Sequence, residues 1–397
     1  MSTEPEFIAY GHTPDLKNFV KSYTRALRKG NEPPGANGQP QPRVPSRGKF
    51  FGMVKLHGTN TTIVFRKAYR NAPLTTATHH FQSRNRNIDA TTDNCGTVAH
   101  LSQAPLIELV NQIMEKHNAN VTVDTEWTEI LVVGETAGHG IQKGVAIAHV
   151  PRLFAIFNIR IDGEWVDMRQ FKDVALKEHR IFNLAAWPTY EMDIDFEKDD
   201  LHKVQTKLME LTDEVVLACP VGLALQAEVE SKVAGRGPPQ TGEGVVWTMV
   251  ESLDENVQLD RHVLSNFKVK GEAFSTTKKL APASPADEAA FTTTKKPAPP
   301  PPADELAKTQ AFADYALGER RFEQGIEFVQ DHLVKAGKAD ESPYQKCLTS
   351  TFTRWVVDDA MREEEVTWME MGVKEQRARM ALFNVTKAWF HAKCDAV

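Results

Sequence analysis

The stretch KLHGTN, residues Lys55–Asn60, joins two short runs rich in β-forming residues, KFFGMVK (Lys49–Lys55) and TTIVF (Thr61–Phe65). A lysine at the end of a strand, followed by a glycine turn, can present its amine to a bound phosphate. For a lysine and a glycine at this spacing alone, a hairpin turn with a surface lysine is the better explanation, but the full six-residue string is far more specific. The stretch therefore predicts two strands joined by a tight turn, with Lys55 as the candidate reactive group.

Further strands and helices are predicted on the C-terminal side of this string. Short β-rich runs predict strands at Glu129–Val133, Val145–Ala148, Leu153–Ile161, Val245–Val250 and Ser265–Lys270. Apolar periodicity predicts helices at Ala104–Lys116 and Asp199–Ala218. The first 275 residues therefore predict an α+β fold with mainly antiparallel strands.

Composition excludes several classes of protein. The chain has 397 residues, enough for two or three domains, and 41% of them are hydrophobic, which excludes collagen-like and wholly disordered chains. No run approaches 18 apolar residues and the N-terminus lacks a secretory signal pattern, so we expect an intracellular protein, in the cytosol or the nucleus. Four cysteines without a CxxC pair argue against a cysteine-bound structural zinc, and His79-His80 lacks a third ligand at metal spacing. The net charge of −6 means that nucleic-acid binding would need a local basic patch.

Shifts in composition divide the chain into four parts. Residues 1–48 are expected to be an N-terminal extension that ends in a Pro/Gly-rich loop, and residues 49–275 form the main domain. Residues 276–305 contain the near-duplicate TTKKLAPASPADE and TTKKPAPPPPADE, which predicts an extended Pro-rich linker; a docking site for a proline-reading module is the alternative. Residues 306–397 predict a small all-α domain.

The C-terminal domain is predicted from apolar stripes. Phe322, Ile326, Val329 and Leu333 follow helical spacing. Two further helices are predicted from the sets Phe352, Trp355, Val356, Met361 and Ala381, Val385, Ala388, Trp389. We expect these aromatic side chains to form a core rather than to contact a ligand.

The KLHGTN string resembles the adenylation motif of covalent nucleotidyltransferases, and its HGTN ending resembles RNA ligases rather than DNA ligases or capping enzymes. Five more segments follow in the order of that family: Gln82–Arg86 (QSRNR), Gly134-Glu135 with Gly140–Val145 (GIQKGV), Leu153–Ile159 (LFAIFNI), Gly242–Val246 (GEGVV) and Phe267–Gly271 (FKVKG). The resemblance covers about Phe50–Phe274 and is greatest to the RNA ligase 2 family of T-even phages and to kinetoplastid RNA-editing ligases. It implies a nucleotidyltransferase (ATP-grasp-like ligase) domain.

The resemblance also implies roles for individual residues. Lys55 would be the nucleophile that carries AMP, Glu135 would hold the ribose, Phe157 would stack on the adenine and Glu243 would bind the metal, Mg²⁺ or Mn²⁺. Glu126, in Asp124-Thr125-Glu126-Trp127, is the rival of Glu135. The remaining implied site residues line the phosphates or assist catalysis: His57, Thr59, Asn60, Arg84, Lys268 and Lys270.

Residue chemistry adds one expectation, and the sequence departs from the family pattern in two places. Lys268 and Lys270 alternate with Phe267 and Val269, so both amines face one side of a strand, where they could lower the pKa of Lys55 and neutralise the α-phosphate. Asn158 stands where phage members usually carry aspartate, which implies weaker metal binding. The interval of about Trp187–Pro239 is extra sequence without an assignment.

The implied function is an ATP-dependent RNA ligase for RNA repair, which joins a 3′-hydroxyl to a 5′-phosphate end through lysyl-AMP and an adenylylated RNA. Another covalent nucleotidyltransferase (a DNA ligase or a GTP-using capping enzyme) and an inactive ligase-fold scaffold that binds RNA or protein remain alternatives. The C-terminal domain would bind either RNA or a protein partner. Its candidate phosphate-binding residues are Lys308, Arg320, Arg321, Arg354, Lys374, Arg377 and Arg379.

Overall fold

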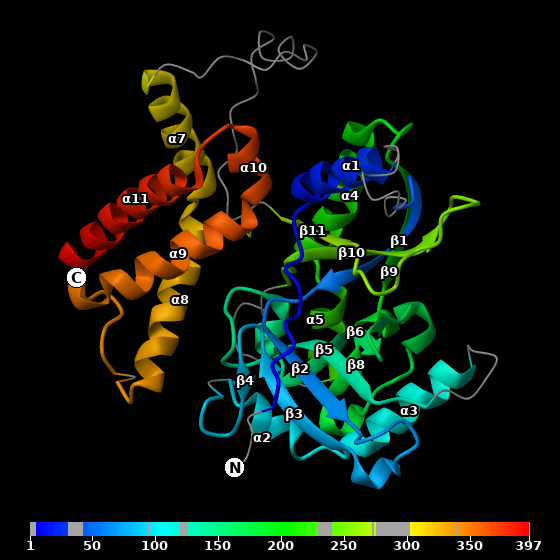
Figure 1. Ribbon diagram of the computed structural model, residues 1–397. Helices are drawn as coiled ribbons and strands as arrows, with labels where there is room; N and C mark the ends of the chain where they lie inside the picture. The colour runs from blue at the N-terminus through cyan, green and yellow to red at the C-terminus, as the bar shows by residue number, and fades with distance from the viewer. Residues whose placement is uncertain are drawn as a thin grey trace. The chain divides into compact units, whose positions relative to one another are not determined.

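The structure, a computed structural model, describes residues 5–30, 43–93, 95–119, 126–228, 240–271, 274, 302–338 and 340–396. The chain divides into two compact units, Met1–Gly271 and Glu272–Val397, which are each described by themselves (Figure 1). Of the predicted linker, residues 276–301 lie outside the described residues, and residues 302–305 form the first turn of a helix. In the part of the chain that is described, no helix is long and apolar enough to cross a membrane.

Two mainly antiparallel sheets form the first unit. A four-stranded sheet has the order β11-β10-β1-β9. A larger sheet has the order β4-β3-β2-β5-β6-β7, and β8 pairs with β6 in the only parallel contact among the named strands. The strands are β1 (Arg47–Lys55), β2 (Thr59–Arg66), β3 (Thr78–Ser83), β4 (Asn87–Ile88), β5 (Glu129–Ala137), β6 (Leu153–Ile161), β7 (Glu164–Trp165), β8 (Ile181–Asn183), β9 (Thr189–Asp195), β10 (Gly244–Ser252) and β11 (Asn266–Lys270). This confirms the predicted α+β class.

Five α-helices accompany the described strands of this unit: α1 (Leu16–Gly30), α2 (Thr97–Leu101), α3 (Leu106–Ala119), α4 (Leu201–Leu217) and α5 (Pro220–Glu228). The interval of about Trp187–Pro239, whose role sequence analysis left unassigned, contains β9, the predicted helix α4 and α5. Strand β9 extends the smaller sheet by pairing with β1, and α4 packs on β10 and β11. The predicted strand Val145–Ala148 is wrong, because Ala146–His149 form a buried 3-10 turn. A four-residue apolar run has too little periodicity to separate a buried turn from a strand.

Helix α1 belongs to the core of the smaller sheet, although sequence analysis placed residues 1–48 in an extension. Phe19, Tyr23 and Leu27 recur every four residues and are all buried. The Phe19 ring lies 5.1 Å from that of Phe267 on β11, and the Tyr23 ring lies 4.6 Å from that of Phe196. Burial of three large side chains gives this helix its position, since each contributes about 1.5–3 kcal/mol.

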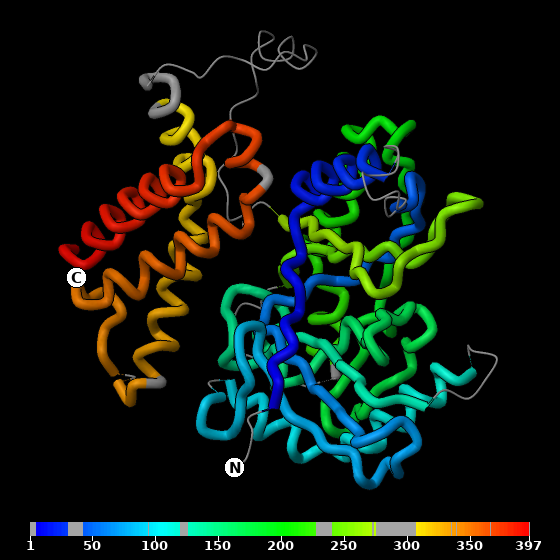
Figure 2. The backbone as a smooth tube through the Cα atoms, viewed as in Figure 1, coloured from blue at the N-terminus to red at the C-terminus, as the bar shows by residue number. Residues whose placement is uncertain are grey.

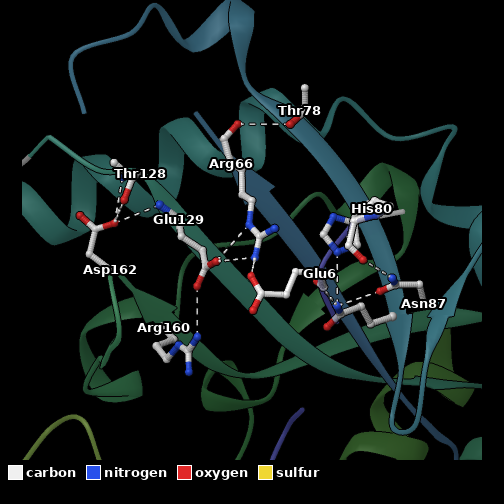
Figure 3. A network of polar contacts seen from close by, with 11 residues as sticks. Glu6, Arg66, Thr78, His80, Asn87, Thr128, Glu129, Arg160 and Asp162 are labelled. Atoms are coloured by element: carbon white, nitrogen blue, oxygen red, sulfur yellow. Dashed lines mark hydrogen bonds and ion pairs between the residues drawn. The ribbon is translucent and has the colours of Figure 1, made fainter. Parts of the chain in front are cut away.

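The segment before α1 crosses both sheets, as the dark blue trace in Figure 2 shows. At the larger sheet, Arg66 forms an ion pair with Glu6 at 3.5 Å, and Asn87 Nδ2 donates a hydrogen bond to the Pro5 carbonyl at 2.6 Å (Figure 3). At the smaller sheet, the Lys268 amide donates to the Pro14 carbonyl at 2.8 Å. The segment therefore ties the two sheets together.

The second unit is helical, as predicted. Its helices are α7 (Pro302–Ala316), α8 (Glu319–Lys335), α9 (Thr349–Glu363), α10 (Glu365–Glu370) and α11 (Glu375–Asp395). The predicted stripe on α8 is buried in one apolar cluster with Phe352, Val356 and Phe390. Arg321, a candidate for phosphate binding, is instead fully buried, with Glu363 at 3.0 Å and Glu364 at 3.6 Å. The expectation for Arg321 is wrong, because its guanidinium serves the internal packing of the unit.

Candidate active site

The KLHGTN string forms the end of β1, a tight turn and the start of β2. Val54 is buried in the sheet, and Lys55 is the last residue of β1, opposite Gly244 on β10. A side chain at Gly58 has no room, because a β-carbon there would lie 2.3 Å from the Thr136 carbonyl oxygen. Glycine therefore allows the turn to pack directly on β5, which fixes the direction in which Lys55 leaves the sheet.

The carboxylate of Glu243 contacts three side-chain nitrogen atoms. Its carboxylate lies 2.7 Å from Lys55 Nζ, 3.3 Å from His57 Nδ1 and 3.3 Å from Lys270 Nζ. The Glu243 side chain is only 3% exposed, so these contacts compensate the cost of burying its charge. The structure thus brings four of the predicted site residues into one cluster.

The protonation of Lys55 differs from the expectation that Lys268 and Lys270 would lower its pKa. Burial lowers the pKa of Lys55, but the charges of Glu243 and Glu135 raise it more, so the pKa lies above its usual value. Burial raises the pKa of Glu243, yet the charges of Lys55 and Lys270 hold it well below the usual range. Without a ligand, the site is therefore a salt-bridged pair in which Lys55 is protonated.

Glu135 is the second carboxylate at the turn. Its Oε1 accepts a hydrogen bond from the Gly58 amide at 3.0 Å. Burial raises the pKa of Glu135 from 4.5 to about 7, while the charge of Lys55 opposes this shift. The rival, Glu126, is exposed, and its carbonyl oxygen accepts a hydrogen bond from Arg70 at the far end of β5. Of the two candidates, only Glu135 lies beside Lys55.

The other residues predicted to line the phosphates lie on strand β2 and in the loop after β3. Asn60 is paired with Glu135 and Thr59 with Thr136 across the β2–β5 ladder. The Asn60 Oδ1 atom is buried and accepts no hydrogen bond, so it is available to a ligand. Arg84 is exposed and contacts His12 Nδ1 at 2.8 Å, and its charge acts on both Lys55 and Glu135. These residues surround the Lys55–Glu135 pair.

Phe157 lies at a bulge in the pairing of β6 with β5. The register with β5 shifts so that Asn158 pairs with Val133 and Ile156 with Gly134, which leaves Phe157 between them. Such bulges re-aim side chains and are frequent beside active sites. The Phe157 ring is half-buried and meets the Tyr10 ring edge-on at 5.6 Å, on the sheet face that carries Val133.

Tyr10 is a site neighbour that sequence reasoning missed. Asn158 Nδ2 donates to the Tyr10 hydroxyl at 2.8 Å, which accounts for an asparagine at this position. Burial raises the pKa of Tyr10 to about 12, and the charge of Glu135 acts in the same direction. No pattern in Pro5–His12 marks this tyrosine, because its position depends on contacts with strands far along the chain.

The predicted lysine pair alternates on β11 as expected. Phe267 and Val269 are buried, whereas Lys268 and Lys270 are half-buried. Lys270 reaches Glu243, and Lys268 is fixed by its backbone beside the segment before α1. Among the described residues, no group of three or more His, Cys, Asp or Glu side chains could hold a metal ion. A metal here would need ligand oxygens from a substrate in addition to protein carboxylates.

A strand-end lysine thus contacts a buried glutamate in an α+β domain of two mainly antiparallel sheets. The chain belongs to the RNA ligase family, since the model of that family matches residues 48–270, more than half of the chain. This confirms the family resemblance of the six segments.

Solved structures with similar folds are RNA ligases of Naegleria gruberi. A variant solved with ATP and Mn is 14% identical with a TM-score of 0.39, and the comparison covers 68% of this chain and 58% of that one. A variant without ligand (15%, TM-score 0.39) and the enzyme with PPi (14%, TM-score 0.36) have the same coverage. The chain thus spans less than two thirds of their length. Comparison with curated protein sequences finds no match.

Proposed function

We propose that the protein is an ATP-dependent RNA ligase that joins 3′-hydroxyl and 5′-phosphate ends through AMP covalently bound to Lys55. The observation that carries this proposal is the contact of Lys55 Nζ with Glu243 at 2.7 Å, with His57 and Lys270 on the same carboxylate. Membership of the RNA ligase family supplies the class of reaction.

In the first step, the Lys55 amine attacks the α-phosphorus of ATP and pyrophosphate leaves. The amine has to lose its proton beforehand, because only the neutral form is a nucleophile. Glu243 and Glu135 favour the protonated form in the free protein, so ligand binding has to weaken their hold. Lys270, Lys268 and Arg84 provide positive charge for the phosphates, and fixed charges of this kind stabilise a phosphoryl-transfer transition state.

The carboxylates fit a divalent cation that is bound jointly with ATP. Mg²⁺ is usually held by one or two carboxylates plus phosphate oxygens, and Mn²⁺ accepts the same ligands. Glu243 offers such a carboxylate, and the free Asn60 Oδ1 is a neutral oxygen on the adjoining strand. A bound cation would supply charge that lowers the pKa of Lys55 and screens the phosphates.

In the second and third steps of ligation, the same side chains act on RNA. AMP passes from Lys55 to the 5′-phosphate of an RNA end, and a 3′-hydroxyl then attacks that end and expels AMP. Glu135 is proposed to hold the ribose and Phe157 to stack on the adenine, a contact worth about 1–3 kcal/mol. Residues 49–275 would carry these steps, residues 276–305 would act as a spacer, and residues 306–397 would engage RNA or a protein.

Self-labelling tests the proposal. The protein is incubated with Mg²⁺ and α-phosphate-labelled ATP, or separately GTP, and then run on a denaturing gel. We expect a label from ATP, its loss in Lys55→Ala, and its retention in Lys207→Ala, which changes an exposed lysine on α4. A label from GTP alone would point to capping chemistry, and no label from folded, AMP-free protein would favour a scaffold. Joining of a 5′-phosphorylated RNA then tests the later steps.

A further inference from the structure

Four basic side chains gather where strands β6 and β8 of the larger sheet begin. Arg152 directly precedes β6, His179 and Arg180 directly precede β8, and His100 lies on α2. Arg180 Nε donates to the Arg152 carbonyl at 3.1 Å, and His100 Nε2 contacts the His179 carbonyl at 2.8 Å. Burial lowers the pKa of His100, and the charges of Arg152, Arg180 and His179 lower it further. The two arginine charges therefore disfavour a proton on His100, a repulsion that a bound anion would offset.

The cluster contains donor and acceptor atoms that the protein does not satisfy. Arg152 Nε and His100 Nδ1 are buried and have no hydrogen-bond partner. Buried charged donors are nearly always paired, because an unmet donor costs several times the value of an ordinary hydrogen bond. An anion would satisfy them.

Arg180 occupies a backbone conformation that favours glycine. Its φ is 52° and its ψ 35°, in the left-handed region. Two backbone hydrogen bonds fix it there, from its own amide to Lys177 at 2.9 Å and to its carbonyl from Phe154 at 3.0 Å. A residue with a Cβ is strained in this region, and such strain is frequent at functional sites. The fold thus holds a strained arginine at the cluster.

The cluster is close to the turn that carries Lys55. The β-carbon of Ala137 borders Gly58, and Gly138 packs so tightly that a β-carbon there would lie 2.8 Å from Arg152 Cα. Ala155 pairs with Glu135, and Arg152 stands three residues from it, about 10 Å along the strand. Because Arg152 directly precedes β6 and Arg180 directly precedes β8, the cluster lies at the ends of these two strands.

We propose that Arg152, Arg180 and His100 form a phosphate-binding site that takes a backbone phosphate of the RNA whose end lies at Lys55. The inference rests on the proposed function, which supplies the RNA. Guanidinium groups match phosphate oxygens in geometry and charge. His100 Nε2 faces a carbonyl and therefore carries a proton, so Nδ1 becomes a donor to phosphate when the ring is protonated. Bound phosphate would also relieve the repulsion within the cluster.

The test is RNA binding by the full chain without ATP or metal. Binding of a fluorescent 5′-phosphorylated oligoribonucleotide is followed by anisotropy over a range of salt concentrations. The variants are Arg152→Gln and Arg180→Gly, and the second suits the backbone at this position, so its fold should be retained. The control is Arg261→Gln, which changes an exposed arginine. We expect the two variants to weaken binding about fivefold to tenfold and to reduce the salt slope by about 0.7 for each lost phosphate contact.

Two parallel measurements separate the possible outcomes. Self-adenylylation of Lys55 should be unchanged in both variants; if the wild-type protein does not label, the proposed function fails, while the RNA comparison still stands on its own. Calorimetry with inorganic phosphate tests whether the site binds free phosphate rather than a phosphate of RNA. An unchanged salt slope in both variants overturns the proposal. Loss of inorganic phosphate binding with intact RNA affinity also overturns it, in favour of a soluble phosphate.

Discussion

Replacing Glu135 with glutamine should change how the stability of the first unit depends on pH. In the folded protein, burial raises the pKa of Glu135 from 4.5 to about 7. Each pKa unit corresponds to about 1.4 kcal/mol, so a difference of about 2.5 amounts to about 3 kcal/mol at most. Because the carboxyl is half-buried and interacts with Lys55, we take this value as the upper limit.

The direction of the pH dependence follows from the number of protons that the folded and unfolded states bind. Between pH 4.5 and about 7, the folded state keeps a proton on Glu135 that the unfolded chain has lost. The free energy of unfolding therefore falls as pH rises through this range, and the contribution is fully present only below the unfolded pKa. Glutamine cannot ionise, so Glu135→Gln loses this dependence. The variant should gain stability relative to the wild type as pH rises from about 5 to about 8, by up to about 3 kcal/mol.

Urea denaturation followed by tryptophan fluorescence at several pH values, in EDTA, measures this difference. The matched control is Glu210→Gln, an exposed position on α4, which should show a constant difference from the wild type. A stability difference between Glu135→Gln and the wild type that stays constant, or that shrinks towards alkaline pH, would refute the reasoning. Such a result would mean that Glu135 is ionised in the folded protein throughout this range.

Four further changes test other parts of the structure. Gly58→Ala should reduce self-adenylylation at least about 100-fold in gel labelling, because the turn cannot close on Thr136 and misplacement of a nucleophile costs that much. Phe19→Ala should lower the free energy of unfolding by about 3–5 kcal/mol in denaturant titration, since the ring is buried against β11. Arg321→Met should cost about 3–5 kcal/mol in the second unit by leaving buried carboxylates unpaired, and thermal scans should show a smaller loss at acidic pH. Deletion of residues 276–397 should leave self-adenylylation largely intact but weaken RNA joining.

Circular dichroism of each variant separates a local effect from unfolding. A Gly58→Ala protein that labels normally would show that the turn has another conformation. Full stability of Phe19→Ala would detach α1 from the core, and an Arg321→Met protein as stable as the wild type would mean that the carboxylates are neutral. Loss of adenylylation in a folded truncation would show that the second unit completes the site.

The sequence was most informative where function and local structure coincide. The strings around Lys55, Glu135, Glu243 and Lys270 predicted strands that contain or adjoin these residues, and the structure brings all four side chains to one place. The alternation of β11 also followed from a period of two. Local pattern was sufficient because each string contains its own strand and turn signals.

Long-range features were not predictable in the same way. Phe19, Tyr23 and Leu27 carry a helical spacing that marks α1 as amphipathic, but its partners on β11 are about 250 residues away. The protonation of Lys55 depends on its contact with Glu243, and this contact follows from the pairing of β1 with β10, about 190 residues along the chain. The bulge at Phe157 and the contact of Tyr10 with Asn158 likewise arise only from pairing between distant segments.

The contacts between the N-terminal segment and β11 have a consequence for folding during synthesis. Asn266 Nδ2 contacts Thr13 Oγ1 across 253 positions, and Asp15 pairs with Lys268. A ribosome that adds about 5–20 residues per second needs roughly 13–50 s to make the intervening chain. Helix α1 emerges early, yet the strand that covers its apolar stripe emerges last in this unit. Until then Phe19 lacks its contact with Phe267, so the nascent chain exposes an apolar helix face that chaperones would be expected to bind.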